Sequence, residues 1–111
     1  MSASKQTGTA WETAIVRYLR ERGFPGAERR ALAGNKDLGD ITGIVGLMVE
    51  AKAAKRHDLA GWSNEAAAQA INCKADMWAV WIKRPRHTSP AAGYVLLDGE
   101  RFVSLLLDAG Y

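Results

Sequence analysis

Apolar residues recur at helical spacing in the first quarter of the chain. Residues 9–24, TAWETAIVRYLRERGF, place Trp11, Ile15 and Leu19 four residues apart, so their side chains fall on one side of a helix. Gly23 follows the last of these residues, as glycine often does where a helix ends. The segment therefore predicts a first helix with one apolar face.

Short apolar runs replace this spacing in the next part of the chain. Residues 40–44, DITGI, and 47–52, LMVEAK, are separated by Val45 and Gly46 and predict a β-hairpin. Residues 26–32, GAERRAL, lie between the helix end and a turn of sequence AGNKDLG. This position predicts a first strand or a sheet edge.

The second half of the chain alternates helical and extended patterns. Residues 65–75, EAAAQAINCKA, predict an alanine-rich helix with Ser63 and Asn64 as candidate caps. Residues 77–84, MWAVWIKR, form a continuous apolar run that is typical of a strand buried on both faces. The remaining segments are a loop, RPRHTSPAAG (84–93), a strand, YVLLD (94–98), and a closing helix, GERFVSLLLDAG (99–110).

The order of these elements, α-β-β-β-α-β-β-α, predicts an α/β fold with a mixed sheet flanked by helices. We expect one domain over residues 9–111, preceded by a flexible N-terminus over residues 1–8. A chain of 111 residues, 48% of them hydrophobic, is near the low end of what buries a sufficient core unaided. A dimer would be a natural supplement.

The expected hairpin gathers charged residues on one face. If the chain folds about Val45, residues whose numbers sum to 90 lie opposite each other, which pairs Asp40 with Glu50. Glu50 and Lys52 are two residues apart on one strand, so they point to the same face. Two carboxylates directly opposite each other repel, and a divalent cation removes that repulsion. A solvated hairpin face is the alternative interpretation, and the pattern favours the metal site.

This combination of residues suits a particular chemistry. Mg²⁺ takes one or two carboxylates, keeps several waters and shares a substrate phosphate. A lysine beside such an ion can hold the attacking water and offset charge on the phosphate. Asp40, Glu50 and Lys52 therefore indicate metal-assisted hydrolysis of a phosphodiester.

Charge and cysteine content bear on the binding partner and the cellular compartment of this protein. The net charge is +3, and Lys and Arg cluster in three places. These clusters indicate either a polyanionic partner or ordinary surface cations, and the two interpretations have equal weight. The single cysteine, Cys73, excludes an internal disulfide and indicates a reducing compartment. The first residues, MSASKQTG, do not resemble a signal sequence, and no run is long enough to span a bilayer. We expect a cytoplasmic protein without a membrane partner.

Glu12 has two interpretations of equal weight. The sequence TAWE fits a capping box, with Thr9 as the helix N-cap and Glu12 returning to the amide of that cap. Alternatively, Glu12 lies beside the core-facing side of the helix and reaches the sheet as a metal ligand or as a group that acts through water.

These residues together resemble the PD-(D/E)xK nuclease superfamily. The stretches GDITGI, VEAKAAKR, DLAGWSNEAAAQA and KRPR are similar to small Holliday junction resolvase-like nucleases of bacteriophages, which are related to archaeal resolvases. The resemblance covers nearly the whole chain. It implies a restriction endonuclease-like αβββαβ core and a Mg²⁺-dependent endonuclease, with Mn²⁺ as a substitute ion. It also implies a homodimer that cuts branched double-stranded DNA by paired nicks.

The resemblance assigns roles residue by residue. Asp40 and Glu50 match the metal-binding acids, Lys52 matches the catalytic lysine, and Glu12 matches an acid on the first helix, which tips its interpretation towards function. The carbonyl of Ala51 is an expected further metal ligand. Gln69 matches a polar residue of the second helix that faces the lysine or a phosphate, although an alanine-rich helix can equally expose it.

Two features depart from the family pattern. Gly39 replaces the proline of the motif, which is a frequent variation, and the loop AGNKD lacks the serine that archaeal resolvases carry there. Asp37 lies at an odd offset from Asp40, so we assign it to loop polarity. His57 and His87 are expected on the surface.

Seven basic residues are candidates for contacts with DNA phosphates. For any one of them, solvation of a strand end is an equal alternative. The tryptophans at 62, 78 and 81 are expected in the core or at a dimer interface. The basic candidates are Arg29, Arg30, Lys55, Arg56, Lys83, Arg84 and Arg86.

Three rival functions differ from a junction resolvase. One is a nuclease of the same fold that acts on ordinary duplex or single-stranded ends in repair or restriction. Another is a DNA-binding module that has lost catalysis, against which the three residues Asp40, Glu50 and Lys52 argue. The last is a structural domain with a polar hairpin face, which leaves the convergence of acids, lysine and basic strand ends unexplained.

Overall fold

The computed structural model describes residues 3–30 and 40–111. The expected AGNKDLG turn, with Asp37 and Gly39, lies outside these residues. The elements in chain order are α1 (Ala3–Glu21), β1 (Glu28–Arg29), β2 (Ile41–Thr42), β3 (Leu47–Lys52), α2 (Leu59–Asn72), β4 (Met77–Ile82), the 3₁₀ turn η1 (Pro90–Ala92), β5 (Tyr94–Leu96) and α3 (Gly99–Asp108).

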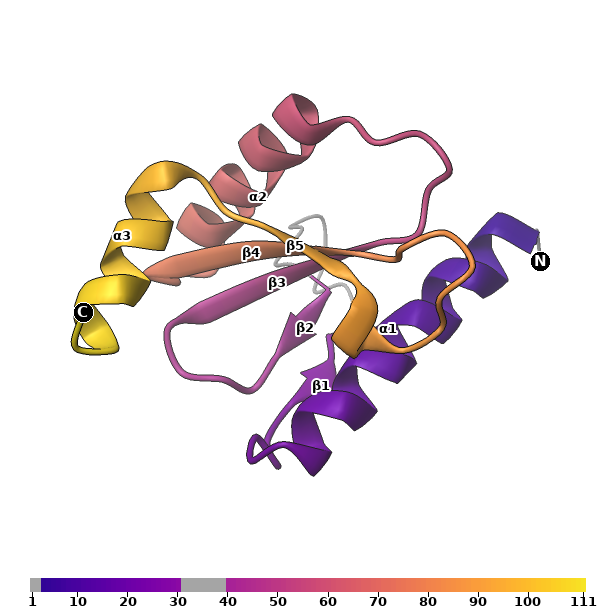
Figure 1. The fold of residues 1–111 in the computed structure, drawn as a ribbon, viewed down its shortest axis with the longest axis horizontal. Helices are drawn as coiled ribbons and strands as arrows, with labels where there is room; N and C mark the ends of the chain where they lie inside the picture. The colour runs from indigo at the N-terminus through magenta and orange to yellow at the C-terminus, as the bar shows by residue number, and fades with distance from the viewer. Residues whose placement is uncertain (1–2, 31–39) are drawn as a thin grey trace.

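Among the described residues, the sheet has five strands in the order β1-β2-β3-β4-β5. All neighbouring strands are antiparallel except β3 and β4, which run parallel and are joined through α2. Figure 1 shows α1 and α2 on opposite sides of this sheet and α3 at the end of the molecule away from the N-terminus. The expected α/β class, the mixed sheet and the order of elements are confirmed.

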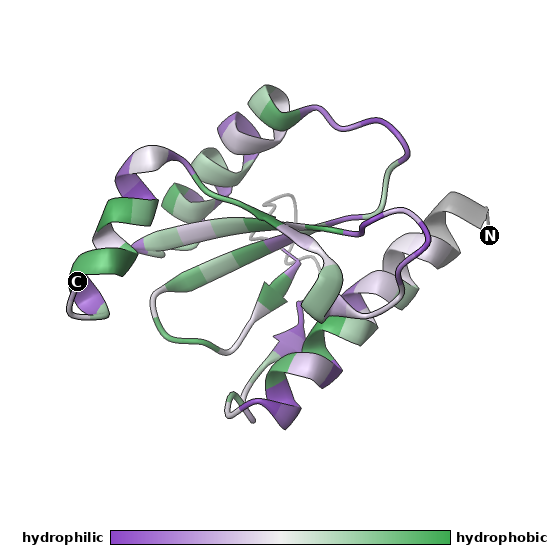
Figure 2. Ribbon diagram, in the orientation of Figure 1, coloured by the Kyte–Doolittle hydropathy of each residue, from purple (hydrophilic) through white to green (hydrophobic). Residues whose placement is uncertain are grey.

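Each face of the sheet carries its own apolar core. On the face covered by α1, the helix contributes Trp11 and Ile15 and the hairpin contributes Ile41 and Val49. Figure 2 shows hydrophobic stretches in the central strands and hydrophilic residues mainly in the loops and on parts of the helices. The buried residues of the face covered by α2 are Met48, Trp62, Ala66, Ala70, Trp78, Val80 and Ile82.

The hairpin register agrees with the sequence prediction. Ile41 pairs with Val49, so paired residue numbers sum to 90. Val49 packs on the α1 side, whereas Met48 packs on the α2 side. Because side chains alternate along a strand, Glu50 and Lys52 belong to the α2 face of β3. The predicted division of the strand between two faces is therefore confirmed.

Helix α1 begins earlier than the capping-box interpretation requires. It starts at Ala3, which places Thr9 inside the helix. The backbone carbonyl of Thr9 accepts a hydrogen bond from the Thr13 hydroxyl at 2.9 Å, an ordinary interaction of a helix interior. Thr9 is therefore not an N-cap, and the capping-box interpretation of Glu12 is wrong.

Helix α2 also begins before the expected caps. Its N-cap is Asp58, whose side chain accepts a hydrogen bond from the Gly61 amide at 3.0 Å. A Cβ at Gly61 would overlap with the Asp58 carboxylate, so glycine allows this carboxylate to fold over the first turn. Ser63 and Asn64 lie within the helix, and the prediction that they cap it is wrong.

The three tryptophans lie where the apolar pattern placed them. Trp62 and Trp78 belong to the core on the α2 side, and Trp81 packs against the core on the α1 side. Cys73 is half-buried against the α2-side core, as expected of a small apolar residue. No helix in the described part of the chain is long and apolar enough to cross a membrane.

Glycine allows a close backbone approach at the base of the hairpin. Gly43 has a φ of +98°, and a Cβ at this position would overlap with the carbonyl oxygen of Gly26. Only glycine satisfies both the conformation and the space. This contact holds the segment before β1 against the strand that follows Asp40.

Candidate functional site

Asp40 directly precedes β2, where hydrogen bonds hold both its backbone and its side chain. Its amide donates to the Val49 carbonyl at 3.1 Å, and its carbonyl accepts from the Arg30 amide at 2.9 Å. Its side chain is held as well, because the Ala51 amide donates to Oδ2 at 2.8 Å. The carboxylate is therefore tied directly to the Glu-Ala-Lys segment of β3.

Glu50 is a buried carboxylate in the middle of the sheet. Its exposed fraction is 3%, and it pairs in register with Val80 of β4. Asp40 directly precedes Ile41, which pairs with Val49, the residue before Glu50, so the two acids lie on neighbouring segments of the hairpin. A buried carboxylate close to a second one is costly unless a cation or hydrogen bonds compensate it, and such positions are common in functional sites.

Lys52 is held by helix α2. Its Nζ lies 3.0 Å from Oε1 of Glu65, and the ammonium lies 5.9 Å from the centre of the Trp62 ring. The lysine side chain is 23% exposed and that of the glutamate is 44% exposed. The ammonium is thus oriented by a carboxylate and an aromatic face while it remains in reach of solvent.

Glu65 was not among the residues that the sequence indicated. It lies one helical turn before Gln69, and residues at this spacing share one side of a helix. That spacing is the signal that could have identified it. Gln69 itself is 4% exposed, so the alternative that an alanine-rich helix exposes this glutamine is wrong.

Glu12 reaches the site from helix α1. Its carboxylate accepts a hydrogen bond from Nε of Arg29 at 3.3 Å. Burial, and then the nearby negative charge of Asp40, raise the pKa of Glu12, although Arg29 opposes both effects. Asp40 is therefore electrostatically coupled to Glu12 on the α1 side and hydrogen-bonded to the strand that carries Glu50.

Basic residues surround this end of the sheet. Because β3 and β4 are parallel, the segments that follow them begin at the same end of the sheet. These segments carry Lys55 and Arg56 on one side and Lys83, Arg84 and Arg86 on the other, and all but the half-buried Lys83 are exposed. The two segments are linked by ring contacts of Tyr94 with Arg84 and His57.

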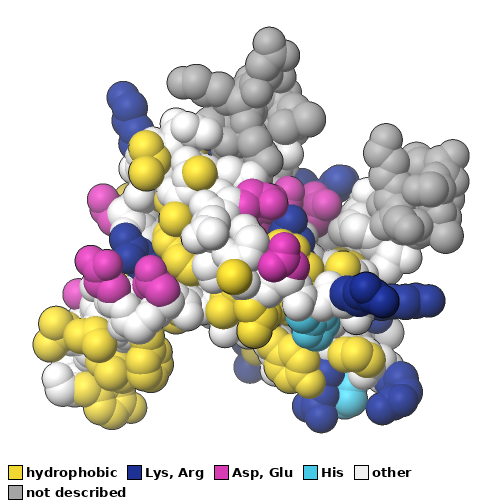
Figure 3. Space-filling view, turned by 90° about the horizontal axis from the view of Figure 1, so that it is seen from above, with side chains coloured by type: hydrophobic (Ala, Val, Ile, Leu, Met, Phe, Trp, Pro, Cys, Tyr) yellow, Lys and Arg dark blue, Asp and Glu magenta, His cyan; other side chains and the backbone are white. Residues whose placement is uncertain are grey.

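The edge strand β1 and the residue that follows it add two further arginines. Arg29 pairs with Glu12, and Arg30 donates to the Thr42 hydroxyl at 2.6 Å. Arg29 therefore lies beside the acids, whereas the Arg30 side chain points towards the hairpin turn, where it borders a pocket with Thr42 and Gly43. Figure 3 shows acidic side chains grouped with Lys or Arg near the centre of the face seen from above, and further basic side chains projecting at its side.

The acids at this site are of the chemical type that Mg²⁺ takes as ligands. Asp40 and Glu50 supply two carboxylates on paired strands, and the carbonyl of Ala51 lies between Glu50 and Lys52 in the chain. Mg²⁺ needs no more than one or two carboxylates because waters and substrate phosphate complete its shell. Within residues 3–30 and 40–111, no group of three or more His, Cys, Asp and Glu side chains is placed to hold a metal. A magnesium site here would therefore depend on Asp40, Glu50 and the Ala51 carbonyl.

Comparisons with models of known families, with curated proteins and with solved structures give no match. The function of this protein is therefore inferred from its residues and their geometry.

Proposed function

We propose that this protein is a Mg²⁺-dependent endonuclease that hydrolyses phosphodiesters of branched double-stranded DNA. The junction of four DNA arms is the proposed substrate, and paired nicks are the proposed outcome. The proposal includes the restriction endonuclease-like core, Mn²⁺ as a substitute ion and a cytoplasmic location in a bacterial or phage-infected cell.

One observation carries this proposal. The Ala51 amide donates to Oδ2 of Asp40 at 2.8 Å, which fixes the first acid against the strand that bears the second acid and the lysine. A solvated hairpin face requires no such hydrogen bond. It also gives no reason for a glutamate that is 3% exposed at position 50.

The residues have separate roles in the proposed reaction. Asp40, Glu50 and the Ala51 carbonyl would hold Mg²⁺, which supplies a Lewis acid and lowers the pKa of a bound water. The ammonium of Lys52 offsets negative charge that develops on the phosphate, and Glu65 keeps this ammonium in place. Glu12 adds a third carboxylate beside Asp40, where it can hold a water through a hydrogen bond.

DNA binding is assigned to the basic residues around these acids. Their guanidinium and ammonium groups contact backbone phosphates, which position the nucleic acid without reading its sequence. Preference for a junction would then arise from the shape of the DNA and from the spacing of two active sites.

The decisive experiment compares a labelled four-way junction with a linear duplex of the same sequence. We expect paired nicks in the junction with Mg²⁺ and none with EDTA. Equal cutting of both substrates would replace the junction resolvase with a general nuclease of repair or restriction type. Tight junction binding without cutting at any Mg²⁺ or Mn²⁺ concentration would refute catalysis and leave a DNA-binding module.

The proposed homodimer is supported by the closing helix. No residue of α3 is buried, and the large apolar residues Phe102, Val103 and Leu107 are each more than half exposed. In Figure 3, apolar side chains cover the end of the molecule where Figure 1 places α3. Burial of such a surface against a second copy is favourable and would supply the second active site.

A charge on this helix tests the dimer. We expect Phe102→Asp to convert a dimer to a monomer in light-scattering measurements across a range of protein concentrations. Ile71→Asp is the control, because Ile71 is an apolar residue on α2 with an exposed fraction of 78%. A wild-type protein that is monomeric at every concentration would refute this part of the proposal.

A further inference from the structure

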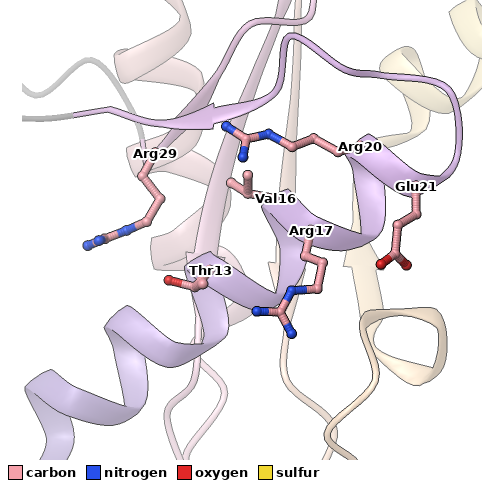
Figure 4. Close-up of a pocket in the computed structure, with 6 residues that line it drawn as sticks. All are labelled: Thr13, Val16, Arg17, Arg20, Glu21 and Arg29. Carbon is pink, nitrogen blue, oxygen red and sulfur yellow. The ribbon is translucent and has the colours of Figure 1, made fainter.

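An open pocket with a volume of about 510 Å³ lies against α1 and β1. We call it the arginine pocket. Figure 4 shows side chains from the helix and the strand around it, with Arg29 at one end and Glu21 at the other. Its lining residues are Thr13, Val16, Arg17, Arg20, Glu21 and Arg29.

The helix presents these residues on one side because of their spacing. Thr13, Arg17 and Arg20 lie four and three residues apart, which places them along the same side of α1. Val16 is 6% exposed and closes the floor of the pocket against the core. The helix therefore contributes two cations to one concave surface.

Two of the three guanidinium groups are held in place by the protein. Nε of Arg20 donates to the carbonyl of Ala27 at 2.7 Å, and Nε of Arg29 donates to Glu12 at 3.3 Å. A guanidinium carries five N–H donors in a planar fork, so one hydrogen bond to the protein fixes the group without using its capacity for a ligand.

The charges of the arginine pocket favour an anion. The lining residues include three arginines and a single carboxylate, that of Glu21. Glu21 lies at the end of the pocket away from Arg29 in Figure 4. Cations gathered on a concave surface attract anions, and guanidinium groups match the oxygen atoms of a phosphate in paired hydrogen bonds.

We propose that the arginine pocket binds a backbone phosphate of DNA next to the phosphodiester that is cut. This inference rests on the proposed function, because Arg29 both borders the pocket and pairs with Glu12 of the candidate site. It extends the DNA path from the two loops beyond β3 and β4 to helix α1. Arg17 and Arg20 become DNA contacts that the sequence did not indicate.

Arg17→Gln tests the pocket, because Arg17 is exposed and lies outside the proposed catalytic residues. Lys74→Gln is the control, since Lys74 is an exposed cation in the turn after α2 and removes the same charge. Junction binding is measured by fluorescence anisotropy in EDTA over a series of salt concentrations. We expect Arg17→Gln to weaken binding several-fold and to lower the slope of log K against log salt by about 1, whereas Lys74→Gln matches wild type.

The two proposals can fail separately. If wild type cuts the junction with Mg²⁺ but Arg17→Gln keeps the wild-type affinity and salt slope, the pocket is refuted and the nuclease stands. If binding depends on Arg17 but no DNA is ever cut, the nuclease is refuted and the pocket remains a site for DNA phosphate.

A second measurement identifies the source of the phosphate. The Nε–H resonances of Arg17 and Arg20 are followed by NMR while either a short DNA duplex or inorganic phosphate is added. We expect both resonances to shift with DNA at concentrations where inorganic phosphate has no effect. Shifts with inorganic phosphate and none with saturating DNA would overturn the assignment to the DNA backbone.

Discussion

Substitution of Asp40 separates its structural role from its proposed catalytic role. Asparagine keeps an oxygen that can accept the Ala51 amide, now 2.8 Å from Oδ2. A hydrogen bond to a charged group contributes about 1.5–3 kcal/mol and a neutral one about 0.5–1.5 kcal/mol. We therefore expect Asp40→Asn to lower the free energy of unfolding by about 1 kcal/mol at most, because the lost repulsion with Glu12 offsets part of the cost.

Alanine at the same position removes the acceptor altogether. The Ala51 amide then loses its bond, and an unsatisfied donor costs about 1–3 kcal/mol. Water can reach part of this half-buried site, so the cost of Asp40→Ala should lie near the lower end of that range. Urea denaturation should therefore rank wild type, Asp40→Asn and Asp40→Ala in order of decreasing stability.

The junction cleavage rates of the two variants should not follow the order of their stabilities. Loss of groups that merely support metal ligands lowers activity by about 10–100-fold, so loss of a ligand should lower the junction cleavage rate by more than about 100-fold in both variants. DNA binding by Asp40→Asn in EDTA should equal or exceed that of wild type, because a negative charge near phosphate is gone. A folded Asp40→Asn protein that cuts at the wild-type rate would refute the proposed site.

Three further substitutions test other parts of the structure. Glu65→Gln should lower kcat for junction cleavage by about tenfold without changing KM, since it removes the ion pair that holds the proposed catalytic Lys52. Equal changes in kcat and KM would contradict this role. Because the pKa of Glu12 is raised, folding loses stability as pH rises from the ordinary carboxyl pKa through the raised one. Glu12→Gln should therefore gain stability relative to wild type over that interval in urea denaturation without divalent ions, and a pH-independent difference would contradict the cause. Gly43→Ala should destabilise by at least about 2 kcal/mol because its Cβ meets the Gly26 carbonyl, whereas Gly99→Ala, where a Cβ meets nothing within 4 Å, should be nearly neutral.

The hairpin could be predicted in detail because two local signals agree. Residues 40–44 and 47–52 are short apolar runs, and Val45-Gly46 between them allows only a short connection. A shift of one residue would have turned Met48 and Val49 away from their cores, so the burial pattern fixed the register. The same register, with Ile41 opposite Val49, brings Asp40 and Glu50 to neighbouring segments of the hairpin.

The starts of the helices could not be predicted as well. Residues before Thr9 show no apolar spacing, yet α1 continues back to Ala3. Asp58 caps α2 five residues before Ser63, which the sequence favoured because Ser and Asn are equally good caps by residue type. The contact of Glu65 with Lys52 joins a helix to a strand that is 13 residues away in the chain, so no local pattern indicates it.

The order of the strands has a consequence for how the protein folds. Every strand pairs with its neighbour in the chain, so few long loops must close before the sheet forms, and loop closure is a main cause of slow folding. The hairpin of β2 and β3 has the shortest connection among the described strands. We therefore expect Asp40 and Glu50 to meet in the folding transition state, before α2 brings Glu65 to Lys52, which φ-values at the hairpin and on the helix would measure.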